Sequence, residues 1–160
     1  MNQQIVEVWK FLAQSKVNYL TIGGFAVNVY GFGRNTGDID IFIEDTLENR
    51  KNLQSALLNL GIEDCSTILT MQFIPGWTDF PLRFGFRLDV LTTVKGLEDL
   101  TFSELITSAT VVNIEDVDVY FLDYKNLIKS KRASSRPKDI LDIEELEKIN
   151  NRNFSKNCQP

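Results

Sequence analysis

Hydrophobic and polar positions repeat along the chain with two different periods, which predicts a mixture of helices and strands. Apolar residues recur at helical spacing in long segments at 4–15, 46–60, 124–133 and 137–149, and in short ones at 25–30 and 102–109. Apolar or alternating runs predict strands at 17–22, 38–43, 68–74, 84–91, 111–114 and 117–122. The alternation of helices and strands predicts an α/β (α+β) fold in one domain over residues 1–149, followed by a polar, flexible tail at 150–160.

Local signals place the ends of several helices. Asp45, with Glu48 three residues later, is typical of a capping box. Asp123 is placed to cap the helix at 124–133, and Pro137 is placed to start the last helix. The spacing in that last helix directs four residues inward: Ile140, Ile143, Leu146 and Ile149.

Residues 75–81 combine turn residues with aromatic ones. Pro75-Gly76 predicts a turn, and we expect 77–81 to be a loop. The aromatic side chains of this loop could cover a bound ligand, or they could simply pack against the protein.

The composition is that of an ordinary globular protein, with 43% apolar and 24% charged residues among 160. The formal net charge of −5 argues against an extended DNA or RNA footprint, which needs a strongly basic surface. No run approaches the roughly 18 apolar residues of a membrane span, and the N-terminus lacks a signal region. We therefore expect a soluble, cytoplasmic protein. Cys65 and Cys158 lie far apart in the sequence, which argues against a disulfide framework.

The lack of histidine restricts the chemistry open to the chain. It excludes Ser-His-Asp and Cys-His catalysis and any histidine metal site. Chemistry must come from carboxylates, lysine, arginine and metal.

The most informative stretch is TIGGFAVNVYGFGRNTGDIDIFIE at 21–44. Successive side chains of a strand point to opposite faces, so Asp38 and Asp40 share one face and the neighbouring isoleucines share the other. Two carboxylates this close repel each other. A hard divalent cation such as Mg²⁺ between them would relieve the repulsion.

Gly23-Gly24 ends one predicted strand and leads into a helix. Such a place presents bare backbone N–H groups and suits a phosphate. A third carboxylate is offered by Asp89 in the strand-like run 84–91, where Arg87 and Asp89 share a face that could meet the carboxylate pair. Asp89 could instead serve only as a salt-bridge partner of Arg87.

Gly23-Gly24, Asp38-x-Asp40 and the later Asp89 together resemble the signature of the nucleotidyltransferase superfamily, whose members resemble the catalytic domain of DNA polymerase beta. The resemblance implies a small mixed sheet with helices packed largely on one side. It also implies that Asp38, Asp40 and Asp89 hold Mg²⁺ or Mn²⁺, and that Asp89 helps to deprotonate an attacking hydroxyl. The implied reaction moves a nucleoside monophosphate from a nucleoside triphosphate such as ATP to a hydroxyl, and releases pyrophosphate.

Further residues are candidates for nucleotide binding. Arg34 and Thr36, in the loop before the Asp38 strand, are suited to a phosphate or to the carboxylates, or they have an ordinary loop role. The segment 131–139 resembles the later Lys and Asp motifs of abortive-infection and toxin-type nucleotidyltransferases, which implies nucleotide-binding roles for Lys131, Arg136 and Asp139. The other reading is electrostatic stabilisation of two helix ends.

Several acceptors are compatible with this reading: a small molecule such as an aminoglycoside or lincosamide antibiotic, an RNA 3′ end, or a protein side chain. The toxin-like features also imply a cognate antitoxin as a partner. The alternative function is a non-catalytic nucleotide-binding or antitoxin-associated module of the same fold.

Overall fold

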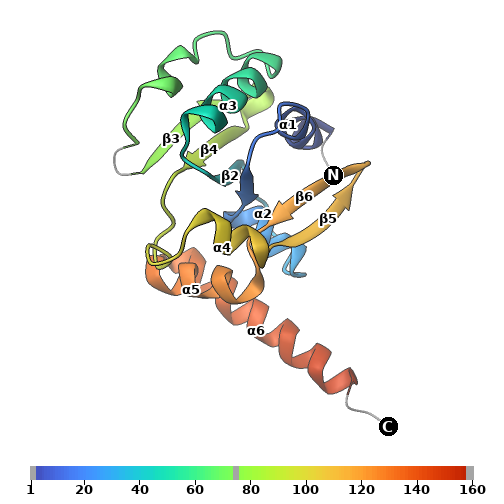
Figure 1. Cartoon of the computed structure of the whole chain (residues 1–160). Coiled ribbons are helices and arrows are strands. Elements are labelled where there is room, and N and C mark those ends of the chain that lie inside the picture. Colours follow the sequence, from blue (N-terminus) through green and yellow to red (C-terminus); the bar gives the residue numbers. More distant parts are fainter. Residues whose placement is uncertain (1–2, 74–75, 158–160) are drawn as a thin grey trace.

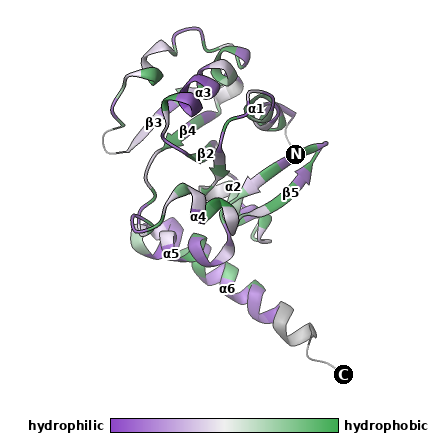
Figure 2. Ribbon diagram, viewed as in Figure 1, coloured by the Kyte–Doolittle hydropathy of each residue, from purple (hydrophilic) through white to green (hydrophobic). Residues whose placement is uncertain are grey.

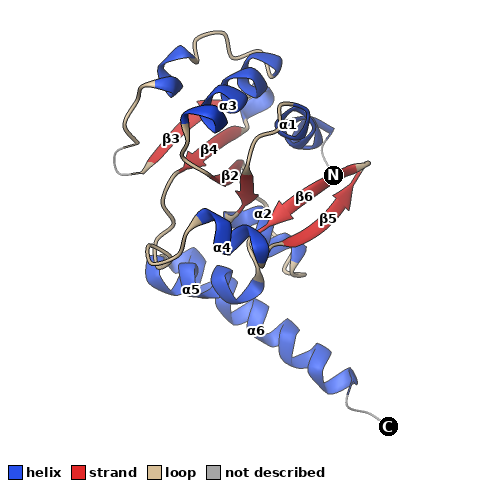
Figure 3. Cartoon of the chain, viewed as in Figure 1, coloured by secondary structure: helices blue, strands red, loops and turns tan. Residues whose placement is uncertain are grey.

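The computed structural model describes residues 3–73 and 76–157 and shows a six-stranded mixed sheet with helices packed around it (Figures 1 and 3). The strand order is β3-β4-β2-β1-β6-β5. The strands are β1 (Tyr19–Thr21), β2 (Asp38–Ile43), β3 (Trp77–Pro81), β4 (Arg87–Leu91), β5 (Thr110–Ile114) and β6 (Val117–Phe121). Neighbours β2/β4 and β1/β6 are parallel, and the other pairs are antiparallel. The predicted α/β (α+β) class and mixed sheet are confirmed.

Six α-helices and two short 3₁₀ helices complete the described chain. The α-helices are α1 (Gln3–Gln14), α2 (Gly23–Val29), α3 (Leu47–Asn59), α4 (Phe102–Thr107), α5 (Tyr124–Ser134) and α6 (Pro137–Asn157). The 3₁₀ helices are η1 (Ser66–Leu69) and η2 (Arg83–Gly85). No helix of the described part is both long enough and apolar enough to cross a bilayer. Cys65 is a buried free thiol, and Cys158 lies outside the described residues.

One face of the sheet carries the hydrophobic core. Alternation along β2 sends Ile39, Ile41 and Ile43 to this face, and all three are fully or almost fully buried. Trp9 of α1 packs edge-on against Phe121 with ring centroids 5.9 Å apart, and its indole N–H donates to Thr21 Oγ1 over 3.2 Å. The opposite face carries Asp38 and Asp40 of β2 and also Phe42, whose ring packs against Phe102 of α4 with centroids 5.6 Å apart.

The start of α3 differs from the sequence prediction. Thr46 is the N-cap residue, and its hydroxyl accepts a hydrogen bond of 3.2 Å from the Asn49 backbone N–H. Asp45 forms an ion pair with Arg50 instead, so the predicted Asp45–Glu48 capping box is wrong. Thr46 caps the helix because it lies one residue before the first helical residue, where a hydroxyl reaches the third N–H of the helix.

The predicted strand at 68–74 is also wrong in its described part. Residues 66–69 form η1, and Ile68 is buried without a strand partner. The guanidinium of Arg50 donates to the Ile68 and Met71 carbonyls over 3.1 and 2.7 Å, so a side chain supplies the hydrogen bonds that a neighbouring strand would have made. Ile74 and Pro75 lie outside the described residues.

The segment expected to be a loop, 77–81, is the edge strand β3. It ends at Pro81, which an edge position tolerates because one side of the strand needs no N–H donor. Its partner β4 begins only at Arg87, since residues 83–85 form η2, so the predicted strand at 84–91 starts too early.

Other local predictions are confirmed. The β5–β6 hairpin turns at Glu115 and Asp116, whose φ values of 47° and 66° match the two left-handed positions of a type I′ turn. Asp123 caps α5 by accepting from the Asn126 backbone N–H.

The last helix is longer than predicted, and a different set of its residues faces the interior. It runs to Asn157 rather than ending near Ile149 and projects away from the body (Figure 1), and its residues 147–152 are mostly hydrophilic (Figure 2). Leu146 is buried as expected, but Ile140 is 51% exposed. Asp139 and Asp142 take the inward positions of the first two turns and are completely buried.

The N-cap of α3 gives the first prediction. Thr46→Ala removes the hydroxyl that satisfies the Asn49 N–H, so we expect a loss of about 1 kcal/mol in the free energy of unfolding, measured by urea denaturation. Thr46→Ser keeps a capping hydroxyl and serves as the matched control. Equal losses in the two variants would show that the hydroxyl does not cap the helix.

Candidate active site

A row of carboxylates crosses three adjacent strands on the face opposite the core. Asp40 of β2 lies directly beside Asp89 of β4, and Asp89 lies directly beside Asp79 of β3. Cross-strand partners point to the same face, so all three carboxylates share it. Asp38 is two residues before Asp40 on the same face, beside Arg87. The pairing of β2 with β4 thus brings Asp38, Asp40 and Asp89 together, as the sequence predicted.

Gly23 allows the Asp40 carboxylate to approach the backbone at the start of α2. Its φ of 63° is in the left-handed region, and a Cβ atom on it would overlap Asp40 Oδ2. A side chain at this position is excluded on both counts. Gly24 has an ordinary φ, but a Cβ on it would lie 2.7 Å from Thr36 Oγ1. Both glycines are therefore required by close contacts, and the positive φ belongs to Gly23.

The carboxylates disturb one another's protonation. Burial raises the pKa of Asp40 from 3.8 to about 6, and the negative charge of Asp89 adds to the rise, while a hydrogen bond from the Gly24 backbone offsets part of it. Burial also raises the pKa of Asp89. There the charge of Asp38 contributes, and hydrogen bonding from the Trp77 side chain opposes the rise. The site holds more negative charge than its own surroundings neutralise.

The donor set suits a hard divalent cation. Asp89 Oδ1 is buried and has no hydrogen-bond partner, which leaves an anionic oxygen without compensation. Carboxylate oxygens are the ligands that Mg²⁺ prefers. Among residues 3–73 and 76–157, no three acidic or cysteine side chains are already gathered around one point at metal-binding distance.

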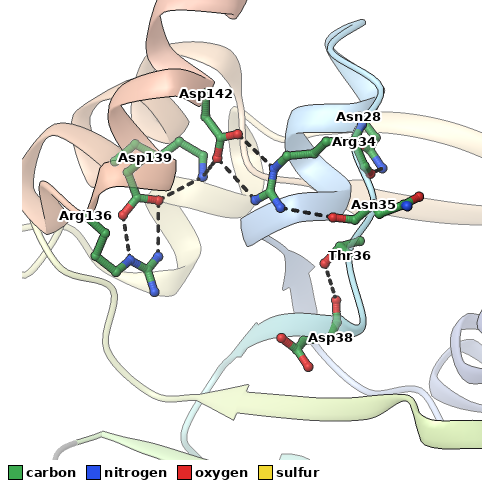
Figure 4. Close-up of polar contacts among 9 residues, drawn as sticks. Asn28, Arg34, Asn35, Thr36, Asp38, Arg136, Asp139 and Asp142 are labelled. Carbon is green, nitrogen blue, oxygen red and sulfur yellow. Dashed lines mark hydrogen bonds and ion pairs between the residues drawn. The ribbon is translucent and has the colours of Figure 1, made fainter.

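Beside the carboxylates lies an ion-pair network of five residues, which Figure 4 shows in close-up. Its members are Arg34 from the loop before β2, Lys131 from α5, Arg136 just before α6, and Asp139 and Asp142 from the first turns of α6. Lys131, Asp139 and Asp142 are buried, Arg34 is partly buried and Arg136 is exposed. The Lys131 ammonium donates to Asp142 Oδ2 over 2.7 Å and to Asp139 Oδ1 over 3.3 Å. Arg34 Nε lies 2.8 Å from Asp142 Oδ1, and Arg136 binds Asp139 through two nitrogens at 2.6 and 3.2 Å. Three cations thus face two carboxylates.

This network changes the interpretation of Lys131. The residue is only 4% exposed and does not simply lie at a helix end. An ammonium has three N–H donors, and within the described chain two of them are bound by Asp139 and Asp142, which leaves one for a ligand. Burial alone would raise the pKa of Asp139, but the hydrogen bond from Arg136 and the charge of Lys131 outweigh it and hold that pKa below its usual value.

Two neighbouring cavities are lined by all ten residues singled out in the sequence. The smaller has a volume of about 250 Å³ and lies at Gly23, Gly24, Arg34, Thr36, Asp38, Asp40, Asp89, Lys131 and Arg136. The larger, of about 560 Å³, shares five of these residues and adds Asp139. Thr36 also donates a hydrogen bond of 3.1 Å to the Asp38 carbonyl, which holds the loop against β2.

Sequence reasoning missed three residues at this site. Asp142 lies three residues after Asp139, so the helical period alone would have placed both on one face. Lys138 lines the smaller cavity, and its charge lowers the pKa of Asp40 in part. Asp79 was missed because its segment was taken for a loop, and only the register of β3 aligns it with Asp89.

Comparisons with known proteins agree with this geometry. A family described as a nucleotidyltransferase of unknown function (DUF6036) matches residues 3–156, and the chain belongs to it. A solved structure of the lincosamide antibiotic adenylyltransferase LnuA with lincomycin bound superposes with a TM-score of 0.62 at 16% identity, covering 93% of this chain and 98% of that one. A candidate nucleotidyltransferase from Thermotoga maritima gives a TM-score of 0.51 at 16% identity, covering 92% and 91%. A comparison with curated proteins finds no match.

These neighbours share the fold of the chain. The family and the fold are therefore those of nucleotidyltransferases, as the spacing of the glycines and aspartates indicated.

The raised pKa of Asp40 predicts a pH-dependent stability in metal-free protein. The folded state holds this proton more tightly than the unfolded state does. The contribution of Asp40 to the free energy of unfolding is therefore complete below pH 4 and is lost as pH rises through about 6. A pKa change from 3.8 to about 6 corresponds to a loss on the order of 3 kcal/mol. Urea unfolding in EDTA from pH 4 to 8 should show this fall in wild type, and Asp40→Asn should show a smaller one, because Asp89 has a raised pKa of its own. Parallel curves for the two proteins would contradict the assignment.

The buried network predicts unequal roles for two lysines of α5. Lys131→Ala leaves two buried carboxylates short of a cation and should cost about 3–5 kcal/mol in the free energy of unfolding. Lys129→Ala is the matched control, because its pair with Asp99 is largely exposed and screened by solvent, so the loss should be much smaller. Similar losses, measured by urea unfolding at pH 7, would show that Lys131 is not held as described.

Proposed function

We propose that the protein is a metal-dependent nucleotidyltransferase that moves a nucleoside monophosphate from a nucleoside triphosphate to a hydroxyl and releases pyrophosphate. The observation that carries the proposal is the row of carboxylates on β2 and β4 facing Gly23, with a cationic cluster at its side. Membership of a nucleotidyltransferase family supports it. The adenylyltransferase neighbour supports a nucleoside triphosphate, ATP for example, as the donor.

Asp38, Asp40 and Asp89 would hold one or two Mg²⁺ or Mn²⁺ ions. The uncompensated Asp89 Oδ1 and the mutual repulsion of Asp40 and Asp89 support this assignment. A bound divalent ion supplies Lewis-acid stabilisation of phosphoryl oxygens and a lower pKa for the attacking hydroxyl.

The chain's own residues would bind the phosphates and orient the acceptor hydroxyl. Gly23 and Gly24 let the Asp40 carboxylate and the Thr36 side chain lie against the start of α2. Both glycines also line the smaller cavity, where their backbone would lie beside the phosphates. Arg136, Lys138 and the free N–H of Lys131 face the same cavity and would bind the β- and γ-phosphates. Asp89 lies on the far side of Asp40 from Gly23, where it would orient the acceptor hydroxyl and accept its proton.

The test is transfer of label from nucleoside triphosphates that carry ³²P at the α-phosphate. Wild-type protein with Mg²⁺ should label one fraction among cellular small molecules, RNA and protein, and EDTA should abolish the labelling. Asp40→Asn should reduce the rate by about 100-fold or more, because it removes an electrostatic contribution made at the reacting phosphate.

The matched control is Asp116→Asn. It changes the same chemical group in the β5–β6 turn, at a left-handed position that asparagine also adopts. Near-normal transfer by Asp40→Asn, or wild-type protein that labels no fraction, would refute the proposed function.

A further inference from the structure

The strand order determines the side from which an acceptor can approach. Moving across the sheet from β1, the strands are β1, β2, β4 and β3. Gly23-Gly24 follows β1, Asp40 is on β2 and Asp89 is on β4. In phosphoryl transfer the attacking hydroxyl and the leaving group lie roughly in line on opposite sides of the phosphorus. With the leaving pyrophosphate at Gly23-Gly24, the acceptor must come from the side of β4 and β3.

The edge strand β3 presents two side chains to that approach. Trp77 and Asp79 are two residues apart and share a face, and Asp79 lies directly beside Asp89. Asp79 forms an ion pair with Arg87, so its charge is already balanced. Trp77 is 41% exposed, and its side chain interacts with the Asp89 carboxyl group. An indole ring is thus placed beside the carboxylate that would receive the acceptor hydroxyl.

The larger cavity joins this ring to the carboxylates. Its volume of about 560 Å³ falls in the usual range for small-molecule sites. Asp40 and Asp89 line it at one end. Trp77, Leu91, Val94 and Leu127 supply apolar lining, and Ser130 and Ser134 add two hydroxyls. The cavity also shares Gly23, Lys131 and Arg136 with the smaller one, so it opens onto the donor side. Apolar lining with two hydroxyls beside charged groups suits a molecule that has both a ring and hydroxyl groups.

On the basis of the nucleotidyl transfer proposed above, we propose that this cavity is the acceptor site. It takes a small, hydroxylated, ring-bearing molecule, which stacks on Trp77. Trp77 is then a specificity-determining residue. It holds the acceptor ring while Asp89 faces the hydroxyl.

The charges around Trp77 favour a small molecule over an RNA 3′ end. A polynucleotide needs cations along its backbone to neutralise successive phosphates. Apart from Lys131 and Arg136, which belong to the donor side, Lys95 is the only cation among the described residues that line the cavity. Arg87 is engaged by Asp79, and the whole chain carries a net charge of −5.

The experiment follows transfer of label from α-³²P-ATP to a small-molecule extract, an RNA fraction and a protein fraction of cells. We expect the label in the small-molecule extract. A dilution series of that extract gives a relative KM for the acceptor, which Trp77→Ala should raise by about tenfold because the aromatic ring is lost. Trp77→Phe keeps an aromatic ring and should stay within about threefold of wild type.

The control is Tyr120→Ala, because Tyr120 is a similarly exposed aromatic residue, at 38%, on β6 across the sheet. It should leave the acceptor KM unchanged. An unchanged KM in Trp77→Ala, or label in the RNA or protein fraction, overturns the acceptor site but leaves the proposed function standing. Failure of wild type to label any fraction refutes the proposed function, and the acceptor site falls with it.

A second measurement separates the acceptor from the base of the nucleotide donor. Trp77 and the fully buried Trp9 are the two tryptophans of the chain, so the difference between wild type and Trp77→Phe isolates the fluorescence of Trp77. α,β-Methylene-ATP with Mg²⁺ should leave acrylamide quenching of Trp77 within about 20% of its original value, as for a side chain outside the donor site. Strong protection by this analogue alone would assign the ring to the donor and overturn the proposal.

Discussion

Two aspartates buried in the first turns of α6 impose the constraint on which the rest of the site depends. A carboxylate without solvent needs opposite charge and hydrogen bonds. Asp142 obtains both from other segments, and Asp139 obtains them from Lys131 of α5 and from Arg136 just before the helix. Arg34 comes from the loop before β2 and Lys131 from α5, so α6 can pack only when the loop and the helix are in place (Figure 4). The network therefore orders three segments that are far apart in the sequence.

The same network places an excess of positive charge beside an excess of negative charge. Its three cations exceed its two carboxylates. The negative charge of Asp40 also contributes to the raised pKa of Arg136. The row on β2 and β4 nevertheless keeps raised pKa values, because burial and mutual repulsion outweigh these cations. A site with cations at one end and uncompensated carboxylates at the other is suited to a ligand that brings both phosphates and metal.

Most of the fold and the outline of the site could be predicted from the sequence, because both depend on local pattern. The two-residue period fixed which face Asp38 and Asp40 share, and the order of glycines and aspartates pointed to the family. Predictions failed where a distant residue decided the outcome. Arg50 took the place of a strand partner for 68–71, and β4 converted the expected loop at 77–81 into an edge strand.

The prediction of the inward face of the last helix was wrong for a related reason. Its apolar residues suggested that Ile140 would point inward, but the cations of other segments made Asp139 and Asp142 the better buried residues. No pattern within the helix could reveal those cations. The roles of Lys131, Arg136 and Asp139 had been weighed one by one, whereas the structure makes them parts of one ion-pair network.

The position of β3 at the edge of the sheet has an evolutionary consequence. The proposed donor side depends on the buried ion pairs of Lys131 with Asp139 and Asp142, so few substitutions of these three residues leave the protein folded. Trp77 and Asp79 are partly exposed, and substitutions at such positions usually alter stability by about half a kcal/mol or less. With the acceptor site proposed above, a lineage with this fold can therefore exchange one acceptor for another by drift along a single strand, while the proposed chemistry at the phosphate stays intact.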